Sequence, residues 1–65
     1  MYWVVTLVET GYVYKSAVRE YAEVIFSANM RAGREVQLDR ENDDGTVDFI
    51  KRYSGAFTRR DGHEG

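Results

Sequence analysis

The sequence contains no cysteine and a single histidine, His63, among its 65 residues. The lack of cysteine excludes disulfides and thiolate metal sites, and one histidine is too few for a zinc site, which takes about three or four protein ligands. Neither a metal nor another cofactor is therefore expected. A chain of this length buries only about 60% of the surface that its unfolded form exposes. A second subunit or a complex is the remaining source of added stability.

The chain also lacks a strong charge of either sign and a long hydrophobic run. Its 9 lysine and arginine residues and 11 aspartate and glutamate residues give a formal charge of −2, which argues against non-specific nucleic-acid binding. No run reaches the roughly 18 apolar residues of a membrane span, and no basic region of a signal peptide precedes the first apolar stretch. We expect a cytoplasmic protein with no membrane partner.

Two strands are predicted ahead of a helix. Residues 2–9, YWVVTLVE, are rich in β-branched and aromatic side chains and are apolar on both faces, which is typical of a central strand. Thr10 and Gly11 offer a turn, and residues 12–15, YVYK, follow as a short second strand. If this short segment does not pair, only one strand precedes the helix.

An amphipathic helix is predicted from Ser16 to Gly33. Ser16 is a favourable N-cap because its hydroxyl can accept a hydrogen bond from the first helical turn, and Gly33 suits the left-handed position that ends many helices. Apolar side chains recur at the spacing of a helix and predict a buried stripe. The stripe comprises Val18, Tyr21, Ala22, Ile25, Ala28 or Asn29, and Ala32, with Val24 and Phe26 at its margins.

Two further strands are predicted after the helix. Residues 35–40 and 46–53 alternate apolar and polar side chains, and the acidic stretch between them contains an Asp-Gly pair, a strong hairpin signal. Residues 55–65 show no periodicity and are predicted to form a flexible tail. The sequence therefore predicts one α+β domain over residues 1–54: a small antiparallel sheet, ββαββ or βαββ, covered on one face by a single helix.

One helix covers one face of such a sheet, so the alternation divides the strands into a covered set and a bare set. The covered set is predicted to comprise Trp3, Val5, Leu7, Val13, Val36, Leu38, Val47 and Phe49. The bare face is predicted to carry Tyr2, Val4, Val8, Tyr12, Tyr14, Ile50 and Arg52, among polar residues such as Thr6 and Gln37. A shift of one residue in a strand would exchange the two sets along it.

The bare face is the main functional signal, because a contiguous apolar patch usually marks an interface and tyrosine suits such surfaces. We expect a non-enzymatic protein-binding module, such as a small regulator or inhibitor of the kind that viruses use. Its partner would be another protein, a second copy of the chain, or both. Two alternatives stay open: a single-stranded nucleic-acid-binding protein that stacks bases on exposed aromatics, and a structural subunit of a larger assembly. Nucleic acid is less favoured because the basic residues are dispersed.

No pattern indicates catalysis. Residues 39–45, DRENDDG, offer oxygen ligands for calcium but lack the spacing of an EF-hand loop, so a hairpin turn is favoured. With no cysteine and with its histidine in the tail, the chain holds no general base beside a nucleophile. The glycines are spread as turn and cap residues and form no phosphate-binding loop. An enzyme is not expected.

Overall fold

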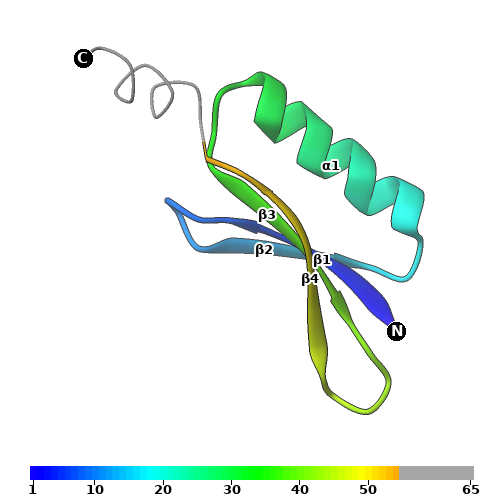
Figure 1. Ribbon diagram of the computed structural model, residues 1–65. Coiled ribbons are helices and arrows are strands. Elements are labelled where there is room, and N and C mark those ends of the chain that lie inside the picture. The colour runs from blue at the N-terminus through cyan, green and yellow to red at the C-terminus, as the bar shows by residue number, and fades with distance from the viewer. Residues whose placement is uncertain (55–65) are drawn as a thin grey trace.

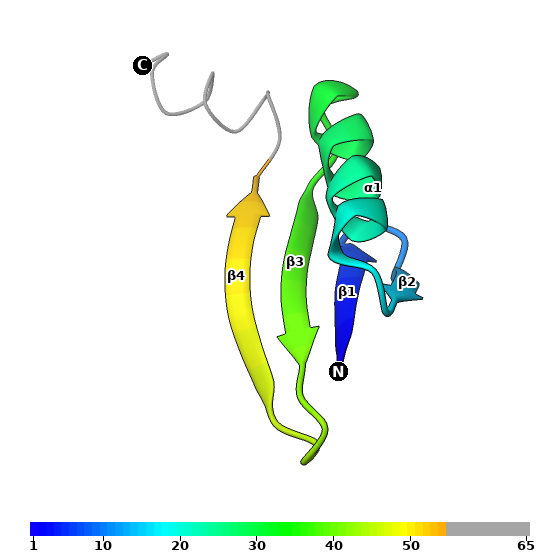
Figure 2. The ribbon, with the colours of Figure 1, turned by 90° about the vertical axis from the view of Figure 1, so that its right-hand side faces the viewer.

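The computed structural model describes residues 1–54, which fold into a four-stranded antiparallel sheet and one helix (Figure 1). The elements are β1 (Tyr2–Leu7), β2 (Tyr12–Ser16), α1 (Arg19–Arg31), β3 (Val36–Glu41) and β4 (Val47–Tyr53). The strands lie in the order β2-β1-β3-β4, and α1 packs on one face of the sheet, over β1, β2 and β3 (Figure 2). The predicted α+β class is confirmed in its ββαββ form. The predicted flexible tail, residues 55–65, lies outside the described residues.

Strand β1 lies in the interior of the sheet, paired with β2 on one side and with β3 on the other. The predicted central position in the sheet is thus confirmed, but α1 covers only one of the two faces of β1. The turn to β2 ends at Gly11. Its φ is 78°, a value that glycine adopts at little steric cost because it has no Cβ. The Gly11 N–H donates to the Leu7 carbonyl at 2.8 Å. The short segment at residues 12–16 thus forms a strand, with Tyr14 opposite Val5.

The helix begins at Arg19, later than the predicted start at Ser16. Ser16 is instead buried at the end of β2. Its Oγ accepts a hydrogen bond from the Val18 N–H and donates one to the Val18 carbonyl, both at 3.0 Å. Val18 takes the N-cap position and offers no side-chain cap. The prediction of a serine cap is therefore wrong, and the hydroxyl orders the turn that leads into the helix.

The helix ends at Arg31, with Ala32 as its C-cap, and Gly33 takes the left-handed position just beyond, as the sequence predicts. Gly33 has a φ of 80°, and its N–H donates to the Met30 carbonyl at 3.0 Å. The Arg34 N–H reaches back to the Asn29 carbonyl, also at 3.0 Å. These two hydrogen bonds form a Schellman motif, which satisfies carbonyls that the last turn would otherwise leave unpaired.

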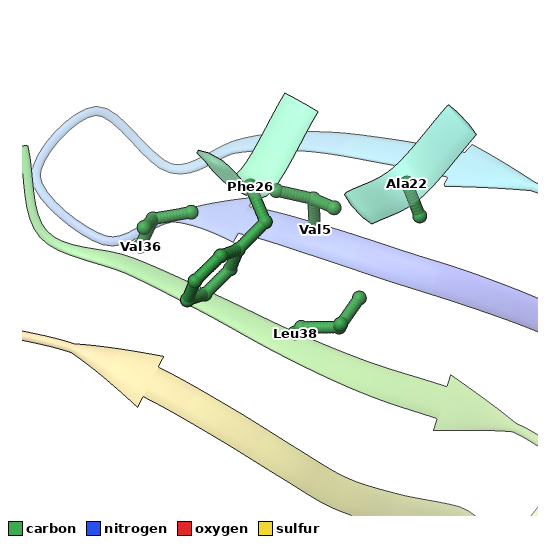
Figure 3. Packing of buried hydrophobic residues seen from close by; sticks show 5 residues of the cluster. All are labelled: Val5, Ala22, Phe26, Val36 and Leu38. Carbon is green, nitrogen blue, oxygen red and sulfur yellow. The ribbon is translucent and has the colours of Figure 1, made fainter. Parts of the chain in front are cut away.

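Five residues from α1, β1 and β3 form the buried core between the helix and the sheet. They are Val5, Ala22, Phe26, Val36 and Leu38 (Figure 3). The ring of Phe26 points from α1 toward β3, where Val36 and Leu38 lie (Figure 3). Half-buried side chains such as Trp3, Ile25 and Met30 pack around this cluster.

The predicted helical stripe is only partly buried. Its exposed residues are Val18, Tyr21, Ala28 and Ala32. Tyr21, placed in the stripe by the sequence, is 61% exposed, whereas Phe26, placed beside it, is 3% exposed. The buried face is centred on Ala22 and Phe26, which lie one turn apart on the same side of the helix. Tyr21 and Val24 consequently project into solvent. Because tyrosine and valine are apolar, the periodicity alone did not identify which of two overlapping stripes is buried.

A β-bulge interrupts the pairing of β3 with β4. Leu38 lies opposite Lys51 and Asp39 lies opposite Phe49, so Ile50 is the extra residue of β4. A bulge breaks the alternation of side chains along the strand that carries it. Lys51 faces the helix, where its Nζ lies 2.7 Å from an oxygen of Glu23 and 4.8 Å from the centre of the Phe26 ring.

Candidate functional site

The face of the sheet that points away from α1 is uncovered by any helix or strand of residues 1–54 (Figure 1 and Figure 2). Residues directly opposite each other on antiparallel strands project from the same face, so the strand register assigns each residue to a face. We call this surface the open face. Its residues are Tyr2, Val4, Thr6, Val13, Lys15, Gln37, Asp39, Glu41, Val47, Phe49 and Arg52.

Two apolar groups lie on the open face, one on each side of β3. On β4, Val47 and Phe49 are 60% and 62% exposed. On the other side, Tyr2 and Val13 are 47% and 51% exposed, and Val4 lies half-buried on β1. Side chains of this size and exposure in one small domain leave a large apolar surface in water, which is the usual mark of an interface.

A row of polar residues runs along β3 between the two apolar groups. It consists of Gln37, Asp39 and Glu41. The cations of the open face are paired with acidic residues of the chain: Lys15 Nζ lies 3.0 Å from an oxygen of Glu41, and Arg52 forms an ion pair with Glu35. The two cations of the open face are thus neutralised by carboxylates of the chain. No ion pair of the described residues involves Asp39, in the middle of the polar row.

The structure places some of the predicted residues on the open face. Tyr2, Val4 and Arg52 lie there. Val8 lies just after β1 in the turn, 39% exposed, and its N–H donates to the Glu35 carbonyl at 3.1 Å. Whether these side chains contact a partner stays a prediction.

The predicted placement of Tyr12, Tyr14 and Ile50 on this face is wrong. Tyr12 lies opposite Leu7 and Tyr14 opposite Val5, so both tyrosines project from the helix side of the sheet. Tyr14 and Ile50 pack against the buried core. The turn between β1 and β2 sets the register of the tyrosines, and the bulge in β4 redirects Ile50.

Sequence reasoning missed three residues of the open face. Val13, Val47 and Phe49 were predicted to be covered by the helix, and all three are exposed on the other side. In β2 the predicted alternation is one residue out of phase. In β4 the bulge at Ile50 puts Val47 and Phe49 on the face opposite to the predicted one, while Arg52 keeps its predicted face. No residue type in these strands signals the phase, because apolar side chains occur on both faces.

The outer surface of α1 is a second, smaller candidate. Tyr21 and Val24 are 61% and 65% exposed there. Beside them lies a shallow depression of about 260 Å³, lined by Glu23, Val24, Ser27, Ala28 and Arg31. Small-molecule sites are typically concave and have volumes of about 300–1,000 Å³. This depression is open and small, and it brings together no group of catalytic side chains.

The aspartates Asp44 and Asp48 of the hairpin between β3 and β4 accept hydrogen bonds from residues of the same hairpin. Hydrogen bonds from the Thr46 hydroxyl and N–H hold the pKa of Asp44 below its ordinary value. The Asn42 amide and the Arg40 guanidinium lower the pKa of Asp48 in the same way. Within residues 1–54, no group of three or more histidine, cysteine, aspartate or glutamate side chains is placed to hold a metal ion. His63 lies outside these residues.

Comparison with known protein families, with curated proteins and with solved structures finds no match to this chain. In the described part of the chain, no helix is both long enough and apolar enough to cross a membrane.

Proposed function

We propose that this chain is a non-enzymatic protein-binding module that acts through the open face. The observation that carries the proposal is the exposure of Val47 and Phe49, with Tyr2 and Val13, on a sheet face that α1 leaves bare. Burying such side chains against a partner removes apolar surface from water, at about 25 cal/mol for each Å². A small regulator or inhibitor, including those of viruses, fits this kind of single-surface domain.

A foreign protein is favoured over a second copy of the chain. Asp39 lies in one of the two inner strands of the sheet, close to the centre of the open face. If two open faces packed together about a twofold axis through that centre, the two Asp39 carboxylates would lie near each other. Like charges brought together in an interface cost several kcal/mol. Light scattering across concentration tests this point, and a stable dimer would contradict it.

Single-stranded nucleic acid is the second candidate, because Tyr2 and Phe49 offer exposed rings and Lys15 and Arg52 lie on the same face. Both cations are already paired with carboxylates of the chain. A phosphate backbone would also approach the acidic row of β3. Weak binding of a fluorescent oligothymidylate at every salt concentration is expected; tight binding that falls steeply with added salt would support this candidate instead.

The proposal is tested by selecting ligands for the purified chain. A phage-displayed library of random nonapeptides is selected on immobilised protein, and the affinities of the selected peptides are measured by fluorescence anisotropy. Phe49→Ser removes an exposed ring from the open face, whereas Val24→Ser removes an equally exposed side chain from the outer surface of α1. Truncation at an interface hot spot costs about 2 kcal/mol or more, or about 30-fold in affinity.

We expect Phe49→Ser to lower the affinity for the selected peptides about 30-fold or more and Val24→Ser to leave it unchanged. Both variants should keep the stability of the parent chain, because both side chains are exposed. If Val24→Ser weakens binding and Phe49→Ser does not, the outer surface of α1 is the interface. If no peptide is selected, the proposal is wrong.

A further inference from the structure

Asp39 is the only charged residue among residues 1–54 that is buried, with 8% of its surface exposed. It lies on the open face in one row with Val4 and Phe49, which are its partners on the neighbouring strands. Each of the other acidic residues described is partly or largely exposed. A charged group is therefore held at the centre of the surface that we propose to bind a protein.

No cation of the described chain reaches this carboxylate. The hydrogen bonds to Asp39 come from the amide Nε2 of Gln37, at 3.0 Å to one oxygen and 3.1 Å to the other. The two cations of the open face are used elsewhere, Lys15 by Glu41 and Arg52 by Glu35. An ionised carboxylate has about four acceptor positions. The one neutral amide of Gln37 fills at most two of them and brings no positive charge.

This arrangement restricts which partner can cover the open face. An apolar surface laid over Asp39 would remove its remaining contact with water and leave a buried charge without a cation, which is strongly unfavourable. A partner that brings a cation to the same point replaces the lost hydration and gains charge-assisted hydrogen bonds. The apolar groups and the central carboxylate together therefore select a partner with a cation among apolar side chains.

An arginine fits this position better than a lysine does. Its planar guanidinium can donate to both oxygens of one carboxylate. It can also stack on an aromatic ring, and the exposed ring of Phe49 is the neighbour of Asp39 on β4. Tyr2 offers a second exposed ring on β1, where Lys15 Nζ already lies 5.6 Å from the ring centre.

We propose that the open face binds a protein segment that presents an arginine, flanked by apolar side chains, to the Asp39 carboxylate. This inference rests on the proposed function, since it names the chemistry of the partner at the same surface. The apolar residues on the two sides of β3 receive the flanking side chains, and Asp39 provides the specificity.

The test uses peptides selected on the full chain from the random nonapeptide library. We expect the selected peptides to be enriched in arginine next to apolar residues. Asp39→Asn keeps the size of the side chain and removes its charge; Asp43→Asn makes the same change in the exposed hairpin loop. The expected result is a loss of affinity of about 30-fold or more for Asp39→Asn and no change for Asp43→Asn. Replacing the arginine of the peptide by citrulline, its neutral analogue, should cause a similar loss.

The outcomes separate this inference from the proposed function. If the selected peptides lack basic residues but lose affinity with Phe49→Ser, the arginine proposal is overturned and the open face remains the interface. Equal binding of an arginine peptide to Asp39→Asn and to the parent chain also overturns it. If the selected peptides are insensitive to Phe49→Ser, both proposals are wrong. Matching urea unfolding curves for Asp39→Asn and the parent chain show that a loss of binding is not a loss of folding.

Discussion

Phe26→Ala tests the position of the helix on the sheet more directly than any other single change. The Phe26 side chain is 3% exposed and packs in the core with Val5, Val36 and Leu38. The Nζ of Lys51 lies over its ring. Truncation to alanine would remove the contacts of this ring with the core and leave a cavity between the helix and the sheet.

The expected loss is a large part of the total stability. Phenylalanine-to-alanine changes in protein cores cost about 3–5 kcal/mol. Folded domains have a free energy of unfolding of about 0.05–0.15 kcal/mol per residue, or about 3–8 kcal/mol for a domain of this length. We therefore expect the variant to retain at most about 5 kcal/mol and, over the lower part of this range, to be largely unfolded at room temperature.

The measurement is urea unfolding followed by the fluorescence of Trp3, the single tryptophan, which packs against the core. Tyr21→Ala is the matched control, because the sequence places Tyr21 in the buried stripe and the structure leaves it 61% exposed. A change within about 0.5 kcal/mol is expected for this variant. If Tyr21→Ala destabilises the chain as much as Phe26→Ala does, the other side of the helix is buried and the reasoning fails.

Two further predictions concern the helix and its contact with β4. The hydrogen bond from Lys51, with Arg19 nearby, lowers the pKa of Glu23 from its ordinary value of 4.5. The stability from this pairing is therefore present above pH 4.5 and is lost as the pH falls through the lower folded pKa. Unfolding curves from pH 7 to pH 3 should show a smaller decline for Lys51→Met than for the parent chain, and parallel declines would contradict the pairing. Gly33→Ala should cost about 1–2 kcal/mol, because an L-residue is strained at the φ of 80° observed there. An unchanged urea midpoint would show that the Schellman geometry is not required.

The sequence by itself determined the elements of this protein and their order, except that it left open whether residues 12–15 pair as a second strand. Signals that lie within a few neighbouring residues were sufficient for this. The helix stop at Gly33 and the Asp-Gly turn before β4 are local features, and the structure confirms them. The ββαββ order with one helix then predicts a sheet with one covered face and one bare face.

Only the tertiary structure decided which residues lie on each face. The turn that ends at Gly11 sets which face each residue of β2 occupies. It places Tyr14 on the helix side, against the core, and Val13 on the open face. The phase of β4 depends on a bulge at Ile50, which exposes Phe49. A shift of one residue in pairing reverses a whole strand, and such a shift leaves composition and alternation unchanged. The position of Asp39 between Val4 and Phe49 likewise exists only once three strands have paired, because those residues lie far apart in the chain.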